Sequence, residues 1–438
     1  MLNNLLDAAS VWAGIGSVLL AVLILLVMVT VHEFGHYVAG KILKFKINEF
    51  SVGFGPALLQ RTNKKTGEKF SLRLIPLGGY CAFEDEDGLE EEREKAEKAE
   101  KDAAMPGDNG ADDVFTDENL RPLPAAPQKA GMDGRKGAEA VKKPSGRFCD
   151  QAPWKRIIVL VSGALMNYLL ALLLIFVSFF AFGQLMLMTY RVEPSTDIAA
   201  EYSFRDGDVI LEAEGKGIYM TTDLMSALKD RREGDLVQFR VSRIVDAATG
   251  ERAEEDIAVQ LRRATDFQNS ADTDRLWEAL GVAKQTDEAG NVTADADGNP
   301  SYLVYSTSYR FGFFETVGRA FMYSFRIAGA IFRVLGELLM GALGPEAFGG
   351  PVTTIAVTSQ IAARGLQPFL EIAAYIGVNL AVFNLLPIPA LDGSKVVFTA
   401  IEWVRGKPVN RKVEAAIHAV GFLLILGFAV LVDILQFL

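Results

Sequence analysis

Long uncharged apolar runs dominate the hydrophobic pattern of this sequence of 438 residues. A helix needs about 20 mostly apolar residues to cross a bilayer. Four runs meet or approach that length, at residues 11–31, 157–190, 372–391 and 415–432. Residues 1–10 contain no Lys or Arg, whereas a cleaved secretory signal begins with a basic segment, so we expect the first run to remain as a span. The pattern therefore predicts an α-helical integral membrane protein with about four transmembrane helices.

Lys and Arg residues near the ends of these runs predict the orientation of the chain, because they concentrate in cytoplasmic loops. They cluster after the first run, before the second, and between the third and fourth: Lys41, Lys44, Lys46, Lys155, Arg156, Arg405, Lys407, Arg411 and Lys412. This distribution predicts that both termini lie outside the cell. The 41–156 segment and the 402–414 loop are then cytosolic.

The segments between the runs predict a membrane-associated β-hairpin, a disordered insertion and an outer domain. Residues 50–80 alternate in polarity and contain glycines, which is typical of paired strands. Residues 84–147 are charged and nearly without aromatic side chains, so they cannot bury enough apolar surface to fold. Strand-like runs at 208–211 and 236–241 predict an extracytoplasmic α+β domain. The expected division is 1–83, 84–147, 148–190, 191–309 and 310–438.

Residues 314–343 are apolar but carry Arg319, Arg326 and Arg333 at intervals of seven, on one face of a helix. A helix with a cationic stripe and an apolar remainder is typical of the membrane interface. The alternative is a fifth span. It would place three Arg side chains in lipid and would reverse the orientation of the 402–414 loop.

The net charge of −11 is local rather than general. Residues 84–118 hold sixteen acidic and four basic side chains, which accounts for the negative balance. The chain has no basic stripe with interleaved aromatic residues, so no nucleic-acid partner is expected. The two cysteines, Cys81 and Cys149, fall in the cytosolic part, where we expect them to be free thiols.

The inner end of the first run carries the sequence His32-Glu33-Phe34-Gly35-His36. Two histidines at i and i+4 lie on one face of a helix, about one turn apart, and can share a metal ion. Glu33 lies beside them and is placed to take a proton from an attacking water. Zinc lowers the pKa of bound water to about 7, which makes hydroxide available at neutral pH. The motif therefore predicts a zinc-dependent protease with Glu33 as its base.

A catalytic zinc site needs a third protein ligand. The only other histidine, His418, lies in the fourth run, where a lone His is more typical of a hydrogen-bonded structural residue. Asp392 is the better candidate, because Pro387 and Pro389 end the third run just before it. The predicted orientation places Asp392 and the two histidines at the same depth, near the cytosolic face.

Three asparagines lie in or beside the apolar runs. Asn379 and Asn384 share the third run, and Asn167 lies in the second. Each amide can hydrogen-bond an extended substrate backbone or an oxyanion. Each can equally form a hydrogen bond between membrane helices. For Asn384 we favour the substrate role, whereas for Asn167 and Asn379 the sequence leaves both roles open. We treat all three as candidate substrate-binding residues.

These motifs resemble those of the site-2 proteases, in the bacterial group of regulated intramembrane proteolysis enzymes. The resemblance covers residues 12–83 and 148–438 and rests on residues 32–36, Gly53-Phe54-Gly55, Pro76-Leu77-Gly78-Gly79-Tyr80 and residues 384–393. It implies His32, His36 and Asp392 as zinc ligands and Glu33 as general base. It also implies that Asn384 helps to hold the substrate strand. Ser394 and Gly163-Ala164 depart from the usual residues of the family.

The outer domain resembles a single PDZ domain, most closely at residues 205–211. Its carboxylate-binding loop is hard to locate in residues 196–204, so a size-filtering role is expected rather than recognition of peptide C-termini. The family implies a bacterial cell membrane and single-span membrane substrates. Anti-sigma factors, signal peptide remnants and pheromone precursors all remain open.

Two other classes of function compete with a protease. A membrane adaptor would use the PDZ-like domain without catalysis, but the complete motif at residues 32–36 argues against it. A metal transporter would need polar side chains through the depth of several spans, and here they collect at one level.

Overall fold

A computed structural model describes residues 2–85, 146–246, 248–269, 272–288, 290–294, 299–344 and 349–437. The insertion predicted at residues 84–147 therefore lies almost wholly outside the described residues. The helices are α1 (Leu2–Ile42), α3 (Pro153–Phe182), α4 (Thr221–Leu228), α5 (Thr273–Leu280), α6 (Phe313–Leu339), α7 (Pro351–Ala362), α8 (Leu366–Leu385), α9 (Asp392–Arg405) and α10 (Arg411–Phe437). The strands are β1 (Ile47–Thr62), β2 (Lys69–Phe83), β3 (Gln184–Thr189), β4 (Asp208–Ala213), β5 (Lys216–Gly217), β6 (Leu236–Asp246), β7 (Glu251–Gln260) and β8 (Val304–Tyr309).

Four helices are long and apolar enough to cross a membrane: Gly16–Ile42 within α1, and α3, α8 and α10. This confirms the predicted number of about four, and α6 is not among the candidates in the described part of the chain. Large apolar side chains such as Leu165, Leu169 and Leu173 recur along one face of α3 and are about half exposed. A soluble surface rarely carries such a stripe, so this face is suited to lipid.

The second apolar run does not continue as a helix to residue 190. Helix α3 ends at Phe182, because Gly183 adopts a φ of 90° that stops the helical path. The chain then enters β3, which pairs with both β4 and β8. The apolar residues beyond 182 belong to a sheet rather than to a span, which corrects the outer boundary of the second segment.

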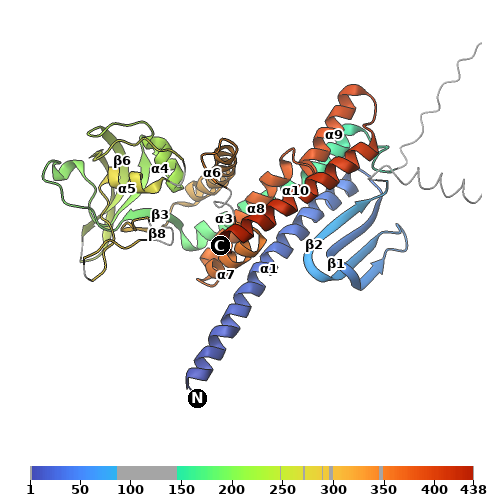
Figure 1. Ribbon diagram of the computed structural model, residues 1–438, viewed down its shortest axis with the longest axis horizontal. Helices are drawn as coiled ribbons and strands as arrows, with labels where there is room; N and C mark the ends of the chain where they lie inside the picture. Colours follow the sequence, from blue (N-terminus) through green and yellow to red (C-terminus); the bar gives the residue numbers. More distant parts are fainter. Residues whose placement is uncertain are drawn as a thin grey trace, which may run out of the picture.

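Residues between α3 and α6 form a sheet domain that lies to one side of the helical bundle (Figure 1). The strand order is β7-β6-β4-β3-β8, and β5 pairs with β4. Its core is built from apolar side chains of the strands and of α4 and α5, including Leu224, Val237, Phe239, Leu276 and Leu280. The observation confirms a β-rich domain inserted in a helical chain. Its relation to PDZ domains stays a prediction.

A buried ion pair joins neighbouring strands of this domain. Arg243 donates two hydrogen bonds to the Asp208 carboxylate, at 2.9 and 2.6 Å. We expect Asp208→Asn to lower the domain's opening free energy by about 3 kcal/mol, because it leaves a buried cation poorly paired. Hydrogen exchange of the β4 and β6 amides in the intact, detergent-solubilised chain measures this quantity. Asp256→Asn, which weakens the exposed pair with Arg240, is expected to cost under about 1 kcal/mol.

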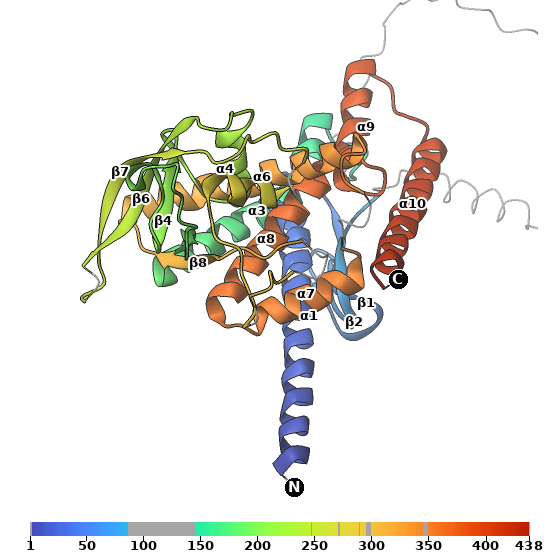
Figure 2. The same cartoon turned by 60° about the vertical axis from the view of Figure 1, so that its left-hand side comes forward.

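Helix α6 joins the sheet domain to the membrane helices, and both views place it between them (Figures 1 and 2). Its apolar face packs against α3 and α8 through residues such as Ala320 and Ile327. A neighbouring face carries the arginine stripe, which contacts the sheet domain rather than forming a free cationic surface. Arg319 bonds Gln184, Arg326 pairs with Asp223, and Arg333 donates to the Thr222 carbonyl. The stripe therefore anchors the domain.

The segment predicted as a β-hairpin forms one, since β1 and β2 pair antiparallel, and this hairpin bends back on itself to form a curled sheet. In β1, Phe50 lies opposite both Cys81 and Phe70 of β2, so this part of the strand has neighbours on both sides. The chain can turn back on itself because Gly53 adopts a φ of 87°, where a Cβ atom would also meet the Ile75 carbonyl at 2.8 Å. The curl brings the last residues of β2 beside α1.

An ionic cluster stabilises this curled sheet. Arg73 donates to the Glu49 carboxylate at 2.7 Å and to the Tyr80 hydroxyl at 2.7 Å. Burial by itself would raise the pKa of Glu49, but hydrogen bonds from Ser71, Arg73 and Tyr80 outweigh that effect and lower it. Glu49 is therefore ionised at neutral pH. Its charge links β1 to Arg73 in the first part of β2 and to Tyr80 in the last part.

Candidate metal centre

Two glycines let α1 and α3 pack closely at the predicted site. A Cβ atom on Gly35 would lie 2.4 Å from the Ser162 carbonyl oxygen and 2.9 Å from the Gly163 Cα. A Cβ atom on Gly163 would lie 2.5 Å from His36 Nε2. Small residues at both positions allow this approach of the backbones. The close contact places the His32 and His36 rings against the backbone of α3.

Three donor atoms converge at this point. Asp392 Oδ2 lies 2.9 Å from His32 Nε2 and 3.2 Å from His36 Nε2, and the two Nε2 atoms are 3.2 Å apart. The histidines come from α1, and Asp392 is the first residue of α9. His32 and His36 are each only 7% exposed, so few waters compete for their nitrogens. Among the described residues, this is the group of three that can hold a metal ion.

The remaining nitrogen of His36 sets the tautomer of its ring. Its Nδ1 lies 2.7 Å from the Val159 carbonyl oxygen of α3. A carbonyl can only accept a hydrogen bond, so Nδ1 must carry a proton, and in the neutral ring Nε2 keeps the lone pair that a metal ion needs. Backbone carbonyls orient metal-binding histidines in this way in many proteins.

The remaining nitrogen of His32 contacts two of the three candidate asparagines. The amide nitrogens of Asn167 and Asn384 lie 3.5 and 3.4 Å from His32 Nδ1. The Asn167 Oδ1 atom is buried and has no hydrogen-bond partner among the described residues. Turning this amide over places Oδ1 opposite Nδ1, where it accepts a hydrogen bond from the Nδ1–H group. His32 Nε2 is then free to bind a metal, so the orphaned oxygen fits a metal-loaded site.

The third asparagine lies away from this cluster. Asn379 donates to the Tyr375 carbonyl of its own helix at 2.9 Å. The structure thus brings Asn167 and Asn384 to the histidines but not Asn379. His418 is also absent from the donor group, and its Nδ1 instead accepts the Ala390 backbone N–H at 3.0 Å.

Glu33 is held by the curled sheet. Its Oε2 accepts the backbone N–H of Cys81 at 3.0 Å. A Cβ atom on Gly79 would lie 3.6 Å from the Glu33 Cγ, so the β2 backbone passes directly beside this carboxylate. The other carboxylate oxygen remains available to accept a proton. A carboxylate fixed next to three candidate metal ligands has the arrangement required of a general base.

Two nitrogens and one carboxylate oxygen form a donor set typical of catalytic zinc. Three protein ligands leave a coordination position for water or substrate, as a catalytic site requires. The hydrogen bonds of Val159 and Asn167 to the histidines complete the outer shell that such sites need. The residues therefore fit a zinc ion.

Several of these supporting groups escape sequence reasoning. The Val159 carbonyl and the Cys81 N–H are backbone atoms, which carry no residue-type signal. The approach of Gly163 to the histidines depends on how two helices cross. A small residue in an apolar run is the only sequence trace of that approach, and many glycines of membrane helices share it.

The close approach at Gly163 leads to a test of the centre. Gly163→Ala would place a methyl group 2.5 Å from His36 Nε2 and 2.8 Å from the His32 ring. Because the imidazoles must turn or the helices must separate, we expect affinity for zinc to fall by about 10- to 100-fold. Competition with a zinc chelator measures this affinity in detergent. Gly329→Ala in α6, which meets no atom within 4 Å, should leave it unchanged. Equal affinities in both variants would contradict the assigned packing.

The geometry defines a class, the metalloproteases with an HExxH helix and a carboxylate ligand from a distant element. The model of peptidase family M50 matches residues 20–428, so the chain belongs to that family. The chain is 26% identical to the zinc metalloprotease RasP of Bacillus licheniformis, over 94% of this chain and 97% of the relative. It is 25% identical to the regulator of sigma-W protease RasP of Bacillus subtilis, over 95% and 97%. The protein is a zinc metalloprotease of the site-2 protease family.

Proposed function

We propose that this protein is an intramembrane endopeptidase that cleaves single-span membrane proteins near the cytosolic face. One observation carries the proposal. His32, Glu33 and His36 lie inside an apolar helix long enough to span a bilayer, and Asp392 follows another such helix after the short loop 386–391. Ionisable groups at this depth are costly and are retained mostly for function. Lys and Arg near the span ends favour the cytosolic side for this end of the bundle.

We propose the following roles for the residues of the centre. His32, His36 and Asp392 hold zinc, which when bound polarises the scissile carbonyl and lowers the pKa of water. Glu33 takes the proton of the attacking water and returns it to the leaving nitrogen. The Cys81 N–H keeps the Glu33 carboxylate oriented. Asn384, whose amide is only partly buried beside His32, hydrogen-bonds the substrate backbone.

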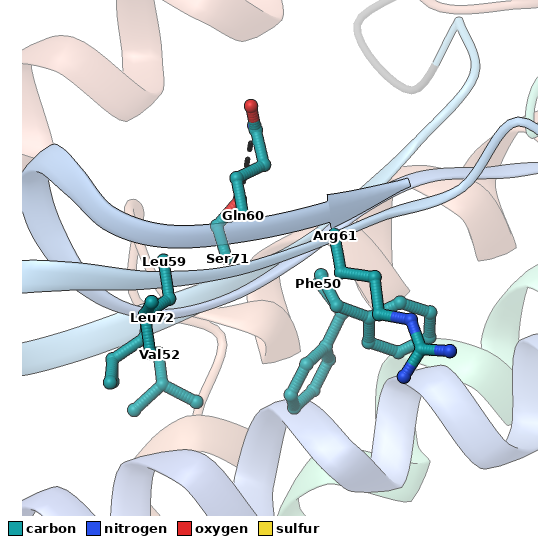
Figure 3. A pocket seen from close by; sticks show the side chains of 8 residues that line it. Phe50, Val52, Leu59, Gln60, Arg61, Ser71 and Leu72 are labelled. Atoms are coloured by element: carbon teal, nitrogen blue, oxygen red, sulfur yellow. Dashed lines mark hydrogen bonds between the residues drawn. The ribbon is translucent and has the colours of Figure 1, made fainter. Parts of the chain in front are cut away.

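A helical substrate must unwind before cleavage, because its peptide groups are hydrogen-bonded within the helix. The curled sheet offers a place for the unwound segment, since its strands can pair with an added strand. One face of this sheet carries a hollow of 420 Å³ lined by Phe50, Val52, Leu59, Gln60, Arg61, Phe70, Ser71 and Leu72 (Figure 3). The Phe50, Val52 and Leu72 side chains point together into it. We propose that apolar substrate side chains occupy this hollow.

The sheet domain between α3 and α6 is proposed to act as a PDZ-like size filter on the outer side. Its firm attachment through the α6 arginines supports a fixed position relative to the membrane helices. Substrates with a large outer part would then be excluded until that part is trimmed. One relative is named as a regulator of sigma-W protease. We therefore propose anti-sigma factors as one substrate class, beside signal peptide remnants and pheromone precursors.

A reconstituted assay tests this function. Purified protein in liposomes is expected to cut a single-span reporter within its span, once the outer part of the reporter is removed. The same reporter with a uniform Leu span should be cut more slowly, because Leu favours the helix and resists unwinding. Mass spectrometry of the products locates the cleaved bond. Hydrolysis of soluble casein without cleavage of either reporter would contradict the proposal.

A further inference from the structure

A strained turn precedes the Asp392 carboxylate. Ala390 adopts a φ of 79°, a conformation that a residue with a side chain rarely takes. Such a residue keeps this conformation only when its surroundings hold it there. The turn also carries Pro387 and Pro389, which remove two backbone donors. The contacts that hold Ala390 therefore matter for where Asp392 points.

Contacts from α10 keep Ala390 in this conformation. The Ala390 backbone N–H donates to His418 Nδ1 at 3.0 Å. The His418 ring also lies against Phe398 of α9, with ring centroids 5.8 Å apart. One helical turn further along α10, Gly421 allows the backbone to approach the same loop. A Cβ atom on Gly421 would lie 2.3 Å from the Pro389 Cβ and 2.9 Å from its carbonyl oxygen.

This contact is local, because much of α10 is otherwise exposed in the protein. Leu423 and Leu424, for example, expose about two thirds of their surface. At the far end of α10, Asp433 bonds the first backbone N–H groups of α7. Between these ends, His418 accepts the Ala390 N–H, and Gly421 approaches Pro389 of the same turn. Contact with lipid does not explain why these two residues of α10 pack against the turn.

We propose that His418 is a positioning residue for the zinc site, acting through the Ala390 turn on the Asp392 carboxylate. This inference rests on the proposed function of Asp392 as a zinc ligand. The Nδ1 atom accepts the Ala390 N–H and stabilises its left-handed conformation. Asp392, two residues later, then lies within 3.2 Å of both Nε2 atoms. Loss of the acceptor lets the turn relax and moves the carboxylate away from the histidines.

A matched pair of variants separates the acceptor from the ring. His418→Phe keeps an aromatic ring beside Phe398 but has no acceptor. His418→Asn loses the ring but places an amide oxygen on Cγ, where Nδ1 is attached in histidine. We expect zinc affinity, measured by chelator competition in detergent, to fall 10- to 100-fold in His418→Phe. In His418→Asn it should stay within about threefold of the unmodified protein. Circular dichroism checks that both variants are folded.

The zinc affinities of these variants either support or overturn the positioning role of His418. Unchanged zinc affinity in His418→Phe, or an equal loss in both variants, would overturn the positioning role. If His418→Phe fails to fold, a second pair on α10 answers the question. Gly421→Ala should lower zinc affinity, because its methyl group meets Pro389, and Gly427→Ala should not, because it meets no atom within 4 Å. Equal affinities in this pair would also overturn the inference.

The positioning role and the proposed function fail in different ways. If the unmodified protein binds zinc and cleaves a single-span reporter while His418→Phe retains full affinity, only the role of His418 is wrong. If Asp392 variants retain zinc, the ligand assignment fails, and the inference fails with it. Zinc binding is measured without substrate, so neither result depends on finding the physiological one.

Discussion

Glu33→Gln is expected to lower peptide hydrolysis by roughly 100- to 10,000-fold while zinc content and helical content stay unchanged. Glutamine has the shape of glutamate, and its amide oxygen can still accept the Cys81 N–H that holds Glu33. What it loses is the ability to take a proton from water. The rate of reporter cleavage in liposomes, with zinc measured on the same sample, tests this expectation.

A matched control for this variant exists in another span. Glu371 of α8 accepts hydrogen bonds from Ser178 and Gln367 and lies away from the metal centre. Glu371→Gln makes the same substitution in a membrane helix and should leave the cleavage rate near that of the unmodified protein. Substantial proteolysis by Glu33→Gln would remove Glu33 from the mechanism. Loss of zinc in that variant would place Glu33 among the ligands instead.

Asp392→Asn is expected to lose both zinc and activity, in contrast to Glu33→Gln. The carboxylate lies 2.9 and 3.2 Å from the two Nε2 atoms and supplies the only negative charge of the three donors. A neutral amide is a far weaker ligand for a divalent cation. We expect affinity for zinc to fall by at least about 100-fold, since a ligand matters more than an outer-shell partner. Elemental analysis after dialysis against a weak chelator measures the loss.

Asp433→Asn provides the control for this change. Asp433 bonds the Val352 and Thr353 backbone N–H groups at the start of α7, at the other end of the bundle. The variant is expected to cost at most about 1 kcal/mol of local stability, because the asparagine amide oxygen still accepts one of these two hydrogen bonds, and it should cause no loss of zinc. Full zinc occupancy in Asp392→Asn would mean that another group completes the site.

The membrane helices were predicted well because a span is a local property of about 20 residues. The exact ends of these helices were not predicted as well, and the second apolar run is an example. Residues 184–189 are uncharged and mostly apolar, yet they form β3 because β4 and β8 pair with it. Hydropathy alone does not distinguish a buried strand from the end of a span.

The arginine stripe of α6 illustrates a second limit. The spacing of Arg319, Arg326 and Arg333 correctly predicts one helical face, since that follows from 3.6 residues per turn. What this face contacts depends on a domain distant in sequence. Asp223, Gln184 and the Thr222 carbonyl supply its partners, and none of them has a position that the α6 sequence could reveal.

For the metal centre, the sequence by itself determined the His32-Glu33-His36 unit, because residues three and four apart on a helix are neighbours in any fold. It also marked Asp392 as an acidic group after a helix-ending pair of prolines. Only the tertiary structure decided that Asp392 meets the histidines, that Val159 and Asn167 orient them, and that His418 holds the turn before Asp392. All but the last of these contacts join residues more than a hundred positions apart, and His418 lies 28 positions from Ala390 on a separate helix. They depend on how helices pack, and local periodicity does not specify that packing.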